Sequence, residues 1–291
     1  MRGDILKKKL MVLCAVAIII STCLSGCKMN SGKIRFGSAG IGGTYQIFGD
    51  TFANLISSKS KKYNIEVKTT AGSAANLRLL SKDYIQMAVA QMDLINDAYN
   101  RTGIFENDKK YQGYRAVASL YTEACQIVVP ADSDIQSMDD LEGKKVCIGE
   151  EESGTEQNAL QILNAYGLNE RLVDTVNLNY TDAAKKLKSG DIDAFFCTAG
   201  VQTTVINELS KQCKIRLVSL DQKGISRLKK SYKFYTEYTI PAGTYVNQTK
   251  KIKTVGVKAV LLASDKLSED TVKDITQILF KINSRFSMHY L

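Results

Sequence analysis

Small polar residues and glycines gather in five short loops, each of which falls between a predicted strand and a predicted helix. A glycine-rich loop leaves backbone N–H groups accessible, and a helix that begins there directs the positive end of its dipole to the same point. Such loops bind a carboxylate or another small anion. The residues that we expect to contact a ligand are Gly43, Thr44, Tyr45, Ser73, Asn76, Gln91, Ser153, Gly154, Thr155 and Thr198.

The same loops offer little for catalysis. None places a nucleophile beside a base, and the single histidine of the chain, His289, stands close to its end. The loop at residues 40–45 lacks the Gly-Lys-Ser/Thr of a phosphate-binding P-loop, and Tyr45 stands where a dinucleotide-binding motif needs its third glycine. We therefore expect a binding protein with no cofactor rather than an enzyme.

Each loop also has a simpler interpretation. Residues 40–45 would serve as a tight turn alone, and residues 71–76 as a helix start in which Ser73 caps the helix. In the same way, Thr44 would cap the helix that follows it. Asp93 follows a buried strand, and we expect it to cap the next helix rather than to contact the ligand. The run of glutamates at residues 150–152 would repel an anion, so we expect these side chains to project into solvent.

Strands and helices alternate along the chain, which predicts an α/β fold with parallel strands. The expected strands cover residues 33–37, 63–69, 86–91, 115–129 (as two strands broken near residues 122 and 123), 145–149, 173–178, 193–198, 215–220 and 255–263. The expected helices cover residues 44–56, 73–80, 93–99, 138–141, 155–165, 181–189, 201–209 and 269–288.

This number of strands predicts two lobes rather than one sheet. Residues 125–130 are the candidate crossing into the second lobe, and residues 235–246, which hold Pro241, are the candidate return. The expected division is residues 33–124 for the first part of lobe one, 125–238 for lobe two and 239–291 for the return to lobe one. Two crossings would give a hinge of two strands.

The N-terminal segment has the pattern of a targeting sequence. A basic stretch to residue 9 precedes an apolar run of 15 residues, 10–24, which is shorter than the ~20 that span a membrane. Leu-Ser-Gly-Cys at residues 24–27 resembles a bacterial lipobox. We expect residues 1–26 to be a signal peptide, Cys27 to be lipidated and residues 27–32 to form a tether, which anchors the protein outside the cytoplasm. An ordinary signal peptide or an uncleaved anchor would be the alternatives.

The net charge and the cysteines restrict the classes of partner and ligand that we expect. The net charge of +9 falls to +6 once residues 1–26, with four basic residues and one acidic residue, are removed. No dense basic run is present, so we expect no nucleic-acid partner and at most weak attraction to an anionic membrane. The cysteines after residue 27 form no CxxC pair, so we expect no metal site. We expect these cysteines to be buried free thiols, and a single disulfide bond between two of them is the alternative. They are Cys125, Cys147, Cys197 and Cys213.

Seven short motifs resemble, in order and spacing over residues 33–289, the TAXI-type solute receptors of TRAP transporters. They are GIGGTY at 40–45, GS at 72–73 with NLRLL at 76–80, AQMD at 90–93, DLEGK at 140–144, SGTE at 153–156, DIDAFF at 191–196 and TIPAGTY at 239–245.

The resemblance implies a type II periplasmic-binding-protein fold, with two lobes that close on a small organic anion or an amino acid such as glutamate or glutamine. It implies a TRAP membrane permease as the partner. Two features depart from the family. We expect relatives to continue beyond Leu291, so the chain would be truncated there, and we identify no arginine clamp, since Arg78 and Arg115 read as surface cations. A sensor for a membrane signalling protein and an enzyme on the same fold are the alternatives.

Overall fold

The computed structural model describes residues 33–108 and 111–283. The expected signal peptide and the lipid site Cys27 lie outside the described residues, as does His289. Within the described ranges, no helix is both long enough and apolar enough to cross a membrane.

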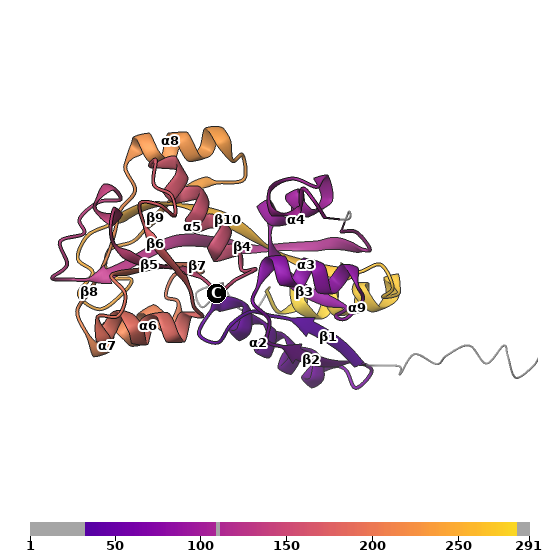
Figure 1. Ribbon diagram of the computed structural model, residues 1–291. Helices are drawn as coiled ribbons and strands as arrows, with labels where there is room; N and C mark the ends of the chain where they lie inside the picture. The colour runs from indigo at the N-terminus through magenta and orange to yellow at the C-terminus, as the bar shows by residue number, and fades with distance from the viewer. Residues whose placement is uncertain (1–32, 109–110, 284–291) are drawn as a thin grey trace, which may run out of the picture. The chain divides into compact units, whose positions relative to one another are not determined.

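In the described part of the chain, ten strands form one mixed sheet, which helices cover on both faces (Figure 1). The sheet order is β2-β1-β3-β10-β4-β7-β5-β6, with β8 paired to β4 and β9 paired to β10. The strands are β1 (Lys33–Gly37), β2 (Asn64–Lys68), β3 (Met87–Gln91), β4 (Tyr114–Pro130), β5 (Lys145–Gly149), β6 (Asp174–Asn177), β7 (Ala194–Ala199), β8 (Ile215–Leu217), β9 (Thr236–Ile240) and β10 (Ile252–Ser264).

The helices follow most of the predicted positions. They are α2 (Thr44–Lys59), α3 (Ser73–Ser81), α4 (Met92–Asn100), α5 (Gly154–Ala165), α6 (Tyr180–Ser189), α7 (Thr204–Gln212), α8 (Gln222–Ser231) and α9 (Glu269–Asn283), with short 3₁₀ turns at Gly103–Phe105 and Asp139–Leu141. Helix α8 and strand β9 were not predicted. Helix α8 has a short apolar face, formed by Ile225 and Leu228, among charged residues.

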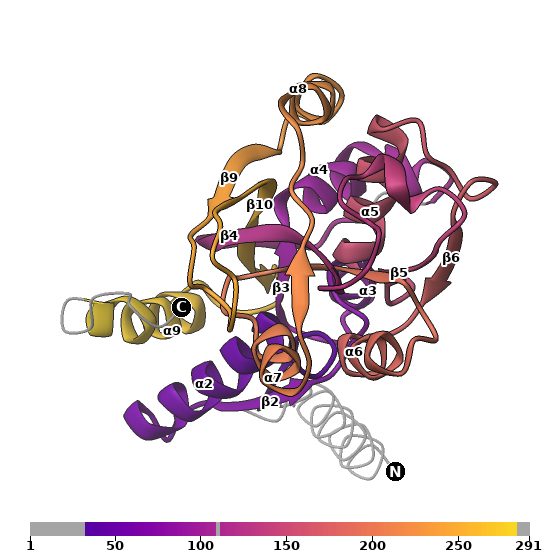
Figure 2. The same ribbon diagram turned by 90° about the vertical axis from the view of Figure 1, so that its left-hand side faces the viewer.

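Four apolar clusters show how the sheet divides. In β3, Met87 and Val89 pack with α2 on one face, whereas Ala88 and Ala90 pack with α3 and α4 on the other. This alternation is the period-2 pattern of a strand that is buried on both faces. We call β1–β3 with α2–α4 and α9 the first half of the molecule, and β5–β8 with α5–α8 the second half. In the second half, α5 and α8 cover one face and α6 and α7 the other (Figure 2).

Two long antiparallel strands, β4 and β10, pass through both halves (Figure 1). The C-terminal part of β10, Ala259–Ala263, pairs with β3, whereas Ile252–Gly256 pairs with β9. The expected break in β4 near residues 122 and 123 is wrong, because β4 is one continuous strand. Apolar residues of β4 pack first in one half and then in the other. In the sequence this change of pattern resembles a boundary between two strands.

The apolar cluster against which the chain packs changes within β10. Ile240, Tyr245 and Ile252 lie in the same cluster as α6 and α7 of the second half. Ala259 and Leu261 lie in the cluster of α2 in the first half. We therefore propose that the chain returns to the first half near Lys258.

Gly256 permits the close pairing of β4 and β10 at this passage. A Cβ atom on Gly256 would lie 2.6 Å from Cγ2 of Thr122 and 2.8 Å from the carbonyl oxygen of Glu123. Both distances are shorter than a carbon atom tolerates, and the second neighbour is backbone, which cannot rotate away.

We predict that Gly256→Ala lowers the free energy of unfolding by about 1–3 kcal/mol, because the strands must separate to admit the methyl group. Urea denaturation measures the change. Lys253→Ala, at an exposed position of the same strand, is the matched control and should stay within about 0.5 kcal/mol of the parent. Equal stability of the two variants would contradict the role given to Gly256.

Candidate functional site

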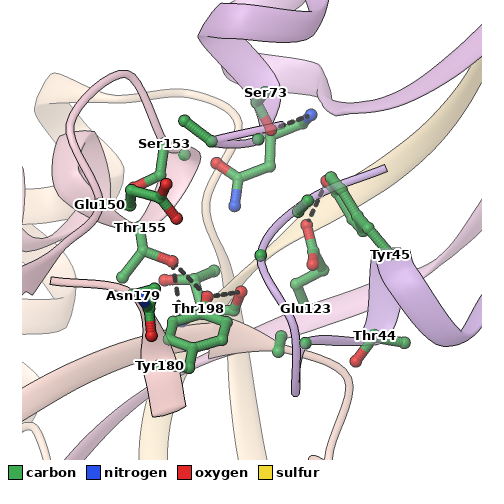
Figure 3. Close-up of a pocket in the computed structure, with 18 residues that line it drawn as sticks. Thr44, Tyr45, Ser73, Glu123, Glu150, Ser153, Thr155, Asn179, Tyr180 and Thr198 are labelled. Carbon is green, nitrogen blue, oxygen red and sulfur yellow. Dashed lines mark hydrogen bonds between the residues drawn. The ribbon is translucent and has the colours of Figure 1, made fainter. Parts of the chain in front are cut away.

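A cavity of about 40 Å³ lies where the two halves meet (Figure 3). About 10–15 Å³ of such space holds one water molecule, so the cavity has room for roughly three water-sized groups. It is lined by Ala39, Gly40, Gly43, Thr44, Tyr45, Ala71, Gly72, Ser73, Gln91, Glu123, Glu150, Ser153, Gly154, Thr155, Asn179, Tyr180, Thr198 and Ala199. Apart from Glu123, which lies within β4, these residues lie at or after the carboxyl ends of strands in both halves, which is where open α/β sheets bind ligands.

Nine of the ten residues expected to contact a ligand line this cavity. Thr44 of the first half and Thr155 of the second half border the same space. Their arrangement is visible in Figure 3. Whether each of the nine binds a ligand stays a prediction.

Asn76 is the exception, because its side chain is fully buried and committed to the backbone. Its amide nitrogen donates to the carbonyl oxygens of Ser38 at 2.7 Å and Val89 at 2.9 Å, and its Oδ1 accepts from the hydroxyl of Thr70 at 2.8 Å. Asn76 therefore ties β1, β3 and α3 together, and it lies outside the lining of the cavity.

The helix starts differ from the expected caps. Gly43 and Gly72 occupy the N-cap positions of α2 and α3, so Thr44 and Ser73 are the first helical residues. Thr44 Oγ1 instead accepts from the backbone N–H of Gly200 in the second half at 3.1 Å. Ser73 Oγ accepts from the N–H of Gln91 at 3.1 Å. In both cases the hydroxyl joins separate segments rather than closing its own helix.

A hydroxyl network holds the second-half wall of the cavity. The Thr155 and Tyr180 hydroxyls lie 2.5 Å apart, and Tyr180 donates to the carbonyl oxygen of Thr198 at 3.0 Å. Ser153 is the N-cap of α5, where its hydroxyl accepts from the N–H of Glu156 at 3.0 Å. The first turn of α5 is thereby fixed against β7.

Glu123 is a cavity residue that the sequence analysis missed. It stands near the middle of β4, 2% exposed, and its Oε2 accepts from the Tyr45 hydroxyl at 2.7 Å (Figure 3). Burial, with a contribution from the nearby Asp93 carboxylate, raises the pKa of Glu123 to about 8, although hydrogen bonds from Tyr45 and Gln91 act to lower it. Glu123 is therefore largely protonated at pH 7.

The glutamates of the α5 loop do not all project into solvent, so that expectation is wrong. Glu150 lines the cavity, where burial raises its pKa. The carbonyl oxygen of Glu152 accepts from the N–H groups of Ala74 and Ala75 in α3, at 3.2 and 3.3 Å. Its carboxylate lies 3.0 Å from Arg78. Only Glu151 is exposed as expected.

Arg78 and Arg115 are both engaged away from the cavity. Arg78 lies between Asp108 and Glu152, while Arg115 lies 3.0 Å from Asp265 at the surface. No lysine or arginine is among the described residues that line the cavity. Positive character in the site therefore comes from backbone N–H groups and helix N-termini.

The halves touch on both flanks of the cavity. On one side, Val205 N–H donates to the carbonyl oxygen of Gly42 at 3.4 Å, and the Thr181 hydroxyl donates to that of Ile41 at 3.3 Å. On the other side, the buried amide of Asn158 donates to Asp93 at 3.2 Å. Asp93, expected as a cap, is thus a contact between the halves. The structure represents a closed arrangement.

The cysteines of the described chain are free thiols, and one of them, Cys125, accepts a hydrogen bond from the hydroxyl of the lining residue Thr198 at 3.6 Å. Cys125, Cys147 and Cys197 are buried free thiols whose pKa values burial raises, and Cys213 is a half-buried free thiol. No group of three potential metal ligands occurs among the described residues.

Sequence signals existed for several of the residues that were missed. Glu123 is the only charged residue of the apolar run from residue 116 to residue 129. Asn179 lies between a predicted strand and a predicted helix, as the five chosen loops do, and Tyr180 begins that helix. The apolar pattern concealed Glu123, because a charged residue inside a strand reads first as an interruption.

Solved structures with a similar fold include proteins that are named for solute binding or transport. One is a putative L-cystine ABC transporter protein from Listeria monocytogenes, 15% identical, with 87% of this chain and 91% of that chain covered and a TM-score of 0.54. Another is arginine-binding protein from T. maritima in its holo form, 15% identical, with 87% and 91% covered and a TM-score of 0.52. The alkanesulfonate-binding protein SsuA from Xanthomonas axonopodis pv. citri, bound to MOPS, is 14% identical, with 87% and 71% covered and a TM-score of 0.51.

These likenesses establish the α/β fold of periplasmic binding proteins, with two lobes joined by two strands, and they confirm the fold class predicted from the sequence. The chain itself belongs to the NMT1-like family, whose pattern it matches over residues 36–289.

The buried carboxyl gives the protein a specific pH dependence. Between about pH 6.5 and pH 8 the unfolded chain has released the Glu123 proton, whereas the native protein retains it. We predict that this contribution to stability is complete below the unfolded pKa and falls as pH rises toward 8, by up to about 1.4 kcal/mol per pH unit. Asp93, whose pKa burial raises to about 6, affects the pH dependence of stability mainly below this pH range.

Urea denaturation at several pH values from about 6.5 to 8 tests this, with Glu123→Gln as the comparison. The parent should lose stability with rising pH more steeply than the variant, which has no proton to release. Parallel slopes in the two proteins would contradict a protonated Glu123.

Proposed function

We propose that this protein is an extracytoplasmic solute receptor of the TAXI type, which captures a small organic anion or amino acid between its two halves and delivers it to a TRAP permease. The observation that carries the proposal is the cavity itself, bordered by loops from both halves at the ends of parallel strands. A ligand that contacts both walls stabilises the closed form, because only closure brings the two walls together.

Binding rather than catalysis agrees with the lining. The hydroxyls of Thr155, Tyr180 and Thr44 are held by hydrogen bonds within the protein, and none is paired with a base that would activate it. The solved structures of this fold are named as binding or transport proteins, which supports the same class.

The membrane partner rests on the seven sequence motifs that resemble TAXI receptors. The receptor would be lipidated at Cys27 after removal of residues 1–26, and the tether of residues 27–32 would hold it at the outer face of the cell membrane. Some solved structures with a similar fold are named for ABC transporters instead. A sensor that presents the closed form to a membrane signalling protein is the alternative partner.

Two experiments separate these possibilities. Mass spectrometry of small molecules that co-purify with the protein identifies the ligand, and a thermal-shift screen checks it, since a ligand at 100 times its Kd stabilises the native state by about 2.7 kcal/mol. Proteoliposomes that contain a TRAP permease from the same genome then test delivery. Uptake that needs this receptor and an ion gradient, without ATP, supports the proposal, whereas chemical turnover of the bound solute would point to an enzyme.

Thr155 offers a direct test of the cavity as the binding site. We predict that Thr155→Ala weakens binding of the co-purified ligand by about 1–3 kcal/mol, because it removes a buried hydroxyl and releases Tyr180. Isothermal calorimetry measures the affinity. Thr204→Ala, at an exposed position that begins α7, is the matched control and should bind as the parent does. Unchanged affinity in Thr155→Ala would refute the assignment.

A further inference from the structure

We infer that the ligand carries an ammonium group, which Glu123 receives at the point where β4 passes between the halves, and that the ligand is therefore a small zwitterionic amino acid rather than a simple organic anion. This inference rests on the proposed function, and it chooses between the ligand classes that the proposal leaves open.

Carboxyl groups reach the cavity from two separate segments of the chain. Glu123 reaches it from β4, which both halves share, and Glu150 reaches it from the loop after β5 in the second half. Among the described lining residues, no lysine or arginine balances them. A ligand that carried only negative charge would meet no cationic side chain here, and it would keep Glu123 in its protonated form.

Gln91 provides an independent observation. Its side chain is 2% exposed and lines the cavity, yet its Oε1 has no hydrogen-bond partner. A buried acceptor without a donor is costly, since it has lost its hydration without replacement. Glu123 stands beside Gln91, and a hydrogen bond from the Gln91 side chain acts on its carboxyl group. An ammonium group has three N–H donors and no acceptor, which matches these groups.

The other end of the ligand meets the opposite chemistry. Helices α2 and α5 both begin at the cavity, at Gly43–Thr44 and Gly154–Thr155; α2 has no acidic residue in its first turn, and the first-turn Glu156 of α5 accepts from the N–H of Glu152 in the preceding loop. Their first N–H groups and dipoles favour a negative group. A zwitterion satisfies both ends, with its carboxylate at the helix starts and its ammonium group at Glu123.

Binding then involves an exchange of charge at Glu123. Before binding, Glu123 is protonated at neutral pH because it is buried. When the ammonium group arrives, the carboxyl group releases its proton to the solvent and becomes the counter-ion of the ligand. The complex keeps one negative and one positive charge at this point, and the buffer receives one proton.

Calorimetry tests the inference directly. A panel of amino acids, paired with the 2-oxo and 2-hydroxy acids of the same carbon skeletons, is screened by thermal shift with the folded mature protein. We expect hits among the amino acids and at least a tenfold loss of affinity when the amino group is replaced. Titration of the best amino acid at pH 7, in buffers of different ionisation enthalpy, should show release of close to one proton.

Glu123→Gln supplies the decisive comparison. The substitution should lower the affinity for the amino acid by roughly 10- to 100-fold and abolish proton release, because a neutral amide cannot act as a counter-ion for the ammonium group. Glu142→Gln, an exposed glutamate outside the cavity, removes the same charge and should change neither quantity. Circular dichroism and the urea midpoint confirm that both variants are folded.

The outcomes separate the inference from the proposed function. One outcome is that the 2-oxo or 2-hydroxy acids bind without proton release, and that Glu123→Gln binds them as tightly as the parent or more tightly. That outcome would overturn the ammonium site but leave the proposed receptor function intact. If no member of either set shifts the melting temperature and no small molecule co-purifies, both are overturned. Amino acids that bind equally well to Glu123→Gln, with proton release intact, would also overturn the assignment of Glu123.

Discussion

The pairing of β4 with β10 is the constraint on which the molecule depends, because both halves are built outward from these two strands. Each strand buries alternate side chains in one half and then in the other, so neither half has a core without them. The passage is narrow, since Gly256 lies directly against Thr122 and Glu123 of the partner strand. Glu123 is therefore held by backbone pairing in both directions along the chain, and its carboxyl group has little freedom to leave the cavity.

Local sequence pattern predicted much of the fold, because strand and helix periods are local properties. The apolar alternation of β3 and the glycine turns before α2 and α5 each have one plain interpretation. The continuity of β4 had no such signal. A strand that serves two cores in turn carries two apolar patterns in one segment, and only pairing with β10, more than 100 residues away, shows that it is unbroken.

Cavity residues could be predicted where the residue types of a loop determine their role. They could not be predicted where contacts with distant segments determine it. Thr155 and Ser153 could be chosen because hydroxyls at a helix start have few other uses. Asn76 looked the same in the sequence, yet three backbone carbonyls of neighbouring segments surround its amide group. Glu152 differs from its expectation in the opposite way, because it was expected to project into solvent and instead contacts the other half. Its backbone has a φ of 63°, and its carbonyl oxygen accepts from N–H groups of α3. No local rule specifies such a partner.

The contacts on the two flanks of the cavity have a kinetic consequence. A molecule enclosed between the halves cannot leave until the bonds at Gly42, Glu152 and Asp93 break together. Residence time is then governed by how often the protein opens, so chemically different guests would share a common upper limit on their escape rate. A membrane component that receives the guest must shorten that wait, and the efficient way to do so is to grip the two halves and draw them apart.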